Sequence, residues 1–151
     1  MRRRTHLVGT LLLLTTVAGC GESAAQKASE KSLEKAADRS VCSAKASAID
    51  SVPKGFPEDF PFPDQTIVYD AEDRGEQGVI LTGISKLPFK DVLAALNGPA
   101  QDAGFKITEG ETEDHDAEAN WTGNGYRGRW AIRESGSCQG ETVVQVLAAS
   151  Q

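Results

Sequence analysis

The cysteines are the residues with the most definite chemistry in this chain of 151 residues. There are three of them, Cys20, Cys42 and Cys138. If the chain is exported and Cys20 is modified, Cys42 and Cys138 form an even pair in an environment where disulfides persist. A bridge between them would close a loop of nearly the whole domain, which is worth about 4 kcal/mol in the chain-entropy model. The alternatives are a free reactive thiol and a metal-binding pair, although no second cysteine pair or supporting histidine accompanies them.

An acidic run forms the second group of residues with potential chemistry. It contains Glu113, Asp114, Asp116 and Glu118. Carboxylate oxygens are ligands of hard cations such as calcium, so this run is a candidate cation-binding site. It lacks the glycine and the ligand spacing of an EF-hand loop. The alternative is the solvated end of a hairpin, because a run of like charges is commonly hydrated.

Three arginines form the third group. Arg127, Arg129 and Arg133 alternate along a predicted strand, so their guanidinium groups should share one face of a sheet. There they could bind an anionic ligand or contact a partner protein. The alternative is that they neutralise Asp116 and Glu118 on the neighbouring strand.

Residues for catalysis are scarce. The chain has two histidines, and His6 lies in the segment that export would remove, which leaves His115. A catalytic zinc site needs several nitrogen or sulfur ligands, so a zinc enzyme is disfavoured. No serine lies in a Gly-x-Ser-x-Gly motif, so a serine hydrolase is disfavoured as well. We therefore expect a non-catalytic protein with no dissociable cofactor.

The start of the chain has the composition of an export signal. Arg2, Arg3 and Arg4 precede an apolar run that ends at Cys20. The run is shorter than the roughly 20 residues of a transmembrane helix. Its last four residues, Val17-Ala18-Gly19-Cys20, resemble the lipobox of bacterial lipoproteins. The resemblance implies a diacylglyceryl group on Cys20 and cleavage just before it. An ordinary signal peptide is the alternative, and the export route, general or twin-arginine, stays open.

Composition then divides the chain into three parts. We expect a lipoprotein signal peptide over residues 1–19, a lipidated cysteine with a flexible tether over 20–41, and one domain over 42–151. This arrangement predicts a protein on the extracytoplasmic face of the cell membrane, held by its lipid anchor and able to bind an envelope protein. The formal net charge is −6 and becomes more negative once the signal is removed, which disfavours nucleic-acid binding.

A proline- and phenylalanine-rich lead-in over residues 52–64 opens the domain. It is similar to lead-ins of small secreted and lipid-anchored proteins of high-GC Gram-positive bacteria, a resemblance that implies no activity. Phe56, Phe60 and Phe62 are expected to turn inward onto the core, because isolated aromatic residues on such a segment usually pack. Docking of this strip on a partner groove is the alternative.

Hydrophobic periodicity predicts strands over 65–72, 79–85, 105–113 and 142–147 and a helix over 88–103 that is interrupted at Pro99. In the first strand, Ile67, Tyr69 and Ala71 are expected on one face. Asn124-Gly125 predicts a two-residue hairpin turn between two further strands. The hairpin register would then place Trp121 opposite Gly128, Ala119 opposite Trp130 and Asp116 opposite Arg133.

These elements predict an α+β domain: a mainly antiparallel sheet of about five strands with one helix packed on one face. The function expected for it is binding of an envelope protein or extracellular ligand. The alternative is capture of a small solute or a calcium-like cation by the acidic hairpin end, and an enzyme is the third interpretation.

Overall fold

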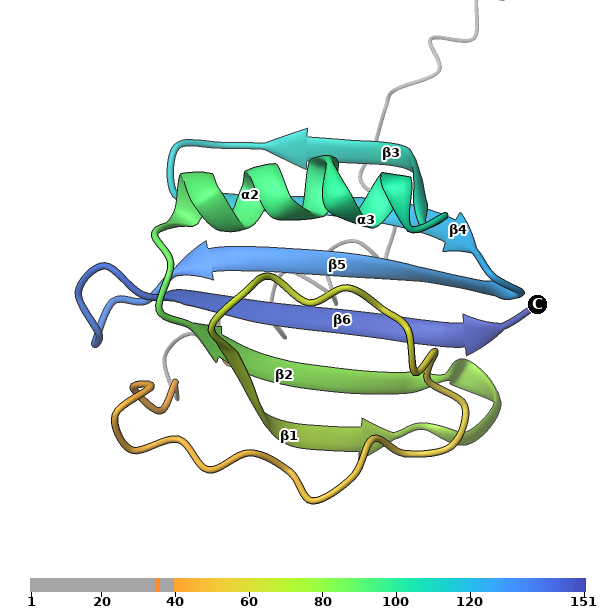
Figure 1. The fold of residues 1–151 in the computed structure, drawn as a ribbon, viewed down its shortest axis with the longest axis horizontal. Coiled ribbons are helices and arrows are strands. Elements are labelled where there is room, and N and C mark those ends of the chain that lie inside the picture. The colour runs from red at the N-terminus through yellow and green to blue at the C-terminus, as the bar shows by residue number, and fades with distance from the viewer. Residues whose placement is uncertain (1–34, 36–39) are drawn as a thin grey trace, which may run out of the picture.

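The computed structural model describes residue 35 and residues 40–151. The predictions for the signal segment, for Cys20 and for most of the tether concern residues outside this part. The described chain forms one antiparallel sheet of six strands in the order β1-β2-β6-β5-β4-β3 (Figure 1). The α+β prediction is confirmed, and the sheet has six strands where about five were expected.

The strands agree closely with the apolar alternation of the sequence. The first two are joined by the short helix η1 (Gly75–Gln77), and β4 and β5 are joined by the turn at Asn124 and Gly125. Their bounds are β1 Thr66–Asp73, β2 Val79–Ser85, β3 Lys106–Thr112, β4 Asp116–Gly123, β5 Tyr126–Glu134 and β6 Thr142–Ser150.

The helical layer lies on one side of the sheet, in front of β3, β4 and β5 (Figure 1). It consists of α2 (Phe89–Asn97) and α3 (Pro99–Asp102), so the predicted interruption at Pro99 is confirmed. The proline ring fixes φ and removes a backbone donor, and it therefore suits the first position of a new helix better than the interior of an old one. The buried residues of α2 are Phe89, Val92 and Leu96.

The lead-in covers the rest of this side, passing in front of β2 and β6 (Figure 1). Phe56 and Phe60 are buried, and Phe62 packs against the core, as expected for an inward-facing strip. The Phe60 ring centroid lies 5.2 Å from that of Phe105 and 5.3 Å from that of Trp121. Helix and lead-in together close the main core over the sheet.

A bulge in β1 corrects one expectation about its faces. The pairing with β2 shifts between Val68 and Asp70, so Ala71 joins Val68 on the main core. Ile67 and Tyr69 instead pack on the opposite side of the sheet, against Ile84, Val143 and Ala46. Placing Ala71 on the face of Ile67 was wrong, because an extra residue in one strand reverses the alternation beyond it.

Candidate functional site

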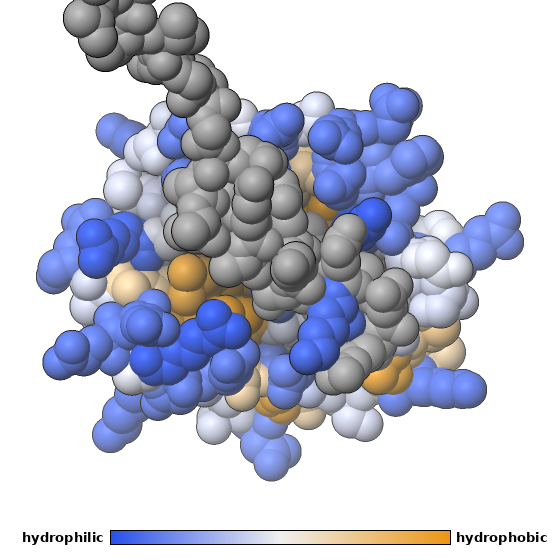
Figure 2. Space-filling view, turned by 180° about the vertical axis from the view of Figure 1, so that it is seen from behind, coloured by the Kyte–Doolittle hydropathy of each residue, from blue (hydrophilic) through white to orange (hydrophobic). Residues whose placement is uncertain are grey.

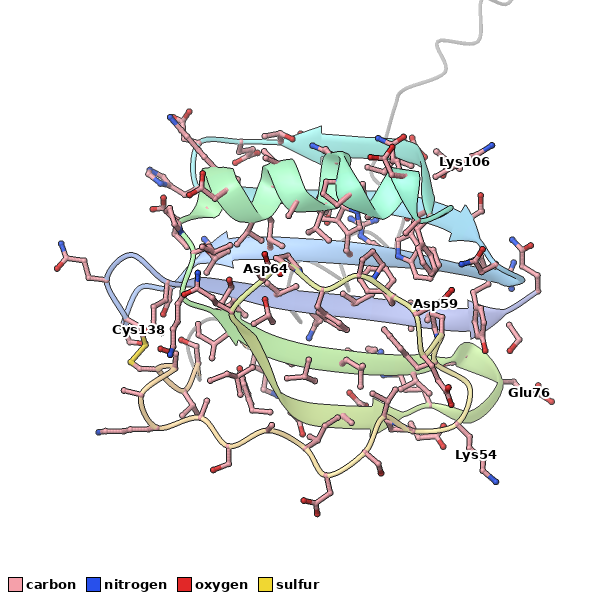
Figure 3. All side chains as sticks on the ribbon, viewed as in Figure 1. Lys54, Asp59, Asp64, Glu76, Lys106 and Cys138 are labelled. Atoms are coloured by element: carbon pink, nitrogen blue, oxygen red, sulfur yellow. A yellow bond between two sulfur atoms is a disulfide. The ribbon has the colours of Figure 1, made fainter. Side chains whose placement is uncertain are left out.

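A disulfide joins Cys42 to Cys138 and confirms the predicted pairing. It lies at the end of the sheet where the β5–β6 loop meets the start of the described domain (Figure 3). The two Cα atoms are 5.4 Å apart, and the residues are 96 positions apart in the sequence. Cys138 is buried. The bridge therefore attaches the segment that enters the domain to a loop near its end.

Hydrogen bonds reinforce the same junction. The backbone N–H of Ser43 donates to Oε2 of Glu141 at 2.9 Å, and its hydroxyl donates to Oε1 at 2.6 Å. Ser40 Oγ lies 3.0 Å from Ser135 Oγ, and the backbone N–H of Cys138 donates to that Ser135 oxygen at 3.1 Å. Sequence reasoning missed Glu141, because no local pattern relates it to a serine 98 positions earlier.

This junction is also the one place in the described residues where three possible metal ligands converge. The sulfur atoms of Cys42 and Cys138 and a carboxylate oxygen of Glu141 all lie within 4.8 Å of one another. The thiolate is the form of cysteine that binds metals, and neither sulfur is a thiolate while the disulfide is intact. The junction therefore acts as a structural attachment.

The acidic run is divided between a loop and a strand. The backbone N–H of Glu113 donates to the carbonyl of Asp116 at 2.8 Å, which closes the β3–β4 turn. Both Glu113 and Asp114 are exposed, while Glu118 lies within β4 and is largely buried. In the part of the chain that the structure describes, their carboxylates do not form a convergent ligand group. The cation-binding site stays a prediction, without support from this geometry.

His115 lies at the tip of the same turn and is exposed. Its Nδ1 is 2.9 Å from Oε2 of Glu134, at the end of β5. The backbone N–H of Glu134 also donates to the carbonyl of His115 at 2.9 Å. The histidine thus links the β3–β4 turn to the end of β5, a role that sequence reasoning did not identify.

The three arginines share one face of β5, as their alternation predicts, and it is the face opposite Trp130 and Ile132, which pack in the main core with the residues of α2. Pairing of β4 with β5 places Arg133 across from Asp116 and Arg127 across from Thr122. Arg129 forms an ion pair with Glu118, and the two side chains are only 14% and 16% exposed. The neutralising role weighed from the sequence is therefore present for Arg129. Arg127 is the exposed member of the group.

The outer surface on this side of the molecule is mixed in character. Figure 2 shows hydrophilic residues projecting around the outline, with apolar residues visible between them. Among the residues with side chains described, Val41 and Val52 are exposed large apolar residues, and both precede β1.

Two residues of β1 have displaced pKa values. Burial, and secondarily the negative charge of Asp70, raises the pKa of the Tyr69 phenol above its ordinary value of 10.0. A hydrogen bond from Arg74 lowers the pKa of the Glu72 carboxyl below its ordinary value of 4.5, and the charge of Arg74 adds to this effect. The Arg74 Nη2 to Glu72 Oε2 distance is 3.0 Å. Both groups lie away from the disulfide junction, on the strand at the edge of the sheet.

Comparisons with protein-family models, with curated proteins and with solved structures each find no match to this chain. Within the described residues, no helix has the length and apolar character needed to cross a membrane.

Proposed function

We propose that this protein is an exported lipoprotein, anchored through a diacylglyceryl group on Cys20, whose domain is a non-catalytic module that binds an envelope protein or extracellular ligand. The observation that carries the proposal is the Cys42–Cys138 disulfide. Disulfides persist outside the cytoplasm, which agrees with the export signal. Because the bridge uses two of the three cysteines, Cys20 of the Val-Ala-Gly-Cys motif has no cysteine partner left within the chain.

The position of the disulfide also suits a domain held at a membrane. A tether ending near residue 41 would deliver any pull to Cys42, where the bridge and the Ser43–Glu141 hydrogen bonds attach the chain to the β5–β6 loop. A pull on the tether would then act on the disulfide and these hydrogen bonds before it could disturb the strand pairing of the sheet.

The partner would be recognised by the face opposite the helices. Arg127 is an exposed residue there, and arginine can bind a carboxylate through two parallel hydrogen bonds. We therefore propose a partner that carries a carboxylate at its contact surface. The acidic net charge of the chain argues against nucleic acid as that partner.

The anchor is tested by native mass spectrometry of the full chain extracted gently from its own membrane. The expected species begins at Cys20, carries diacylglycerol and gains hydrogen when reduced. A species that begins elsewhere and carries no lipid would refute the anchored form.

The binding face is tested in the same membrane with a photo-crosslinking amino acid at position 127 and, as a matched control, at Lys90 on the exposed side of α2. Crosslinks to one defined protein from position 127 but not from position 90 would support the proposal. Equal labelling from both positions would contradict it.

Cation capture remains the alternative, with Glu113, Asp114, Asp116 and Glu118 as its ligands. It requires that calcium raise the melting temperature and that the increase disappear in the Glu113→Gln, Asp116→Asn double variant. The ion pair of Glu118 with Arg129 argues against this alternative, because the pair already uses one of the four carboxylates.

A further inference from the structure

The Asn124 side chain links three segments that are far apart in the sequence. Its Nδ2 donates to Oδ2 of Asp59 in the lead-in at 2.8 Å and lies 3.4 Å from the carbonyl oxygen of Ala103, just after α3. Asn124 itself lies in the turn between β4 and β5. One amide group therefore holds the lead-in and the end of the helical layer to the hairpin, and Asp59 is seen at this end of the molecule in Figure 3.

The same residue is followed by glycine, and this sequence occurs twice in the chain, at Asn97-Gly98 and Asn124-Gly125. A glycine after asparagine leaves its backbone nitrogen unshielded by a side chain. That nitrogen can attack the asparagine side-chain carbonyl, which is the first step of deamidation. The two pairs are chemically identical, so their environments decide which of them reacts.

The two environments differ at the attacking nitrogen. The N–H of Gly98 donates to the carbonyl of Ala94 at 3.0 Å, at the end of α2. In the described backbone, the N–H of Gly125 has no backbone acceptor, and its carbonyl accepts from Gln151. Asn124 and Gly125 are both exposed, with φ values of 51° and 83°. Water and base therefore reach the second pair, while a helical hydrogen bond occupies the first.

We propose that Asn124 is a deamidation site of the folded protein, that Asn97 is protected from the same reaction, and that the reaction releases the lead-in from the hairpin. The Gly125 nitrogen forms a bond to the side-chain carbonyl carbon of Asn124 while the bond to Nδ2 breaks. Ammonia leaves with the proton of the backbone N–H. Water then opens the five-membered imide and leaves either an aspartate or an isoaspartate at position 124.

In the product, the hydrogen bond between residue 124 and Asp59 is replaced by repulsion. An amide donor is replaced by a carboxylate, which places two negative groups where a hydrogen bond of 2.8 Å had been. Like charges at this separation repel, and the aspartate side chain has no N–H group to donate. The carbonyl of Ala103 loses its donor in the same step. The lead-in, which places Phe60 against Phe105 and Trp121, would thus become less firmly held.

The reaction is tested by incubating the full chain at mildly alkaline pH and mapping its peptides by mass spectrometry with an isoaspartate assay. We expect Asn124 to convert several-fold faster than Asn97, because the hydrogen bond that holds the Gly98 N–H is worth about 1 kcal/mol, which corresponds to roughly a fivefold difference in rate. Conversion at Asn97 first, equal rates at the two sites, or no conversion at either would overturn the assignment.

The consequence is tested separately with Asn124→Asp, which reproduces the aspartate product and keeps a residue that tolerates a positive φ. Its melting temperature should fall by about 5 °C, and the decrease should become smaller in an Asp59→Ala background, because the repelling partner is absent. A decrease of the same size in both backgrounds would refute the role of Asp59.

Discussion

Trp121 on β4 lies directly across from Gly128 on β5, and its indole covers the space where a side chain would stand. A Cβ atom on residue 128 would come within 2.5 Å of the Trp121 ring and within 1.9 Å of the Leu147 carbonyl oxygen. The pairing of Trp121 with Gly128 therefore follows from the Asn-Gly turn and also allows the indole to pack in the core.

Gly128→Ala is therefore expected to lower the free energy of unfolding by about 3 kcal/mol, since both the ring and a strand backbone must move. Urea denaturation measures the change. The control is Gly136→Ala, where an added Cβ meets no atom within 4 Å. Similar losses in the two variants would contradict the packing described for Trp121.

Removal of the disulfide with Cys42→Ser and Cys138→Ser should lower the free energy of unfolding by about 2–4 kcal/mol, because the unfolded chain regains the freedom of a long loop. The free energy of unfolding of the wild type measured with reductant should equal that of the double variant measured without reductant. If reductant also shifted the double variant, the effect could not be assigned to this bridge.

Glu118→Gln should lower the free energy of unfolding by about 1–3 kcal/mol, because it leaves the Arg129 guanidinium without its carboxylate in a largely buried position. The matched control is Glu72→Gln. Glu72 forms an ion pair with Arg74, and the two side chains are 56% and 38% exposed, respectively. Loss of that pair is expected to change the free energy of unfolding by less than about 0.5 kcal/mol. A larger effect for the Glu72 variant would contradict the difference in burial.

The free energy of unfolding should decrease in alkaline solution because Tyr69 ionises. Its pKa is raised in the folded protein, so the unfolded chain releases the phenolic proton at a lower pH than the folded chain does. The stabilising contribution is complete below the unfolded value of about 10 and is lost as the pH rises through the folded value.

An ultraviolet absorbance titration should therefore show one tyrosine that ionises late, and this component should be missing in Tyr69→Phe. The same variant should lose less unfolding free energy than the wild type between neutral and alkaline pH. A late component that persists in Tyr69→Phe would assign the shift to another residue.

Structural features that depend on a few residues close together in the sequence, or on a count of one residue type, were predictable from the sequence. The Asn-Gly turn determined the register of β4 and β5, including Asp116 across from Arg133, because a two-residue turn leaves only one pairing for its arms. Pro99 determined the break in the helix through its ring and missing donor. The Cys42–Cys138 pairing followed from counting cysteines once Cys20 was set apart as a predicted lipidation site.

Long-range contacts were decided only by the tertiary structure. Hydrophobic alternation identified β6, but its place between β2 and β5 depends on which strands bury their faces together, and no local pattern records this. The bulge in β1 escaped detection because an even alternation looks the same with or without an extra residue. Ser43 with Glu141 and Asn124 with Asp59 are likewise pairs of common polar residues, 98 and 65 positions apart. Their types alone permit many partners, and only the folded sheet brings these atoms within hydrogen-bonding distance.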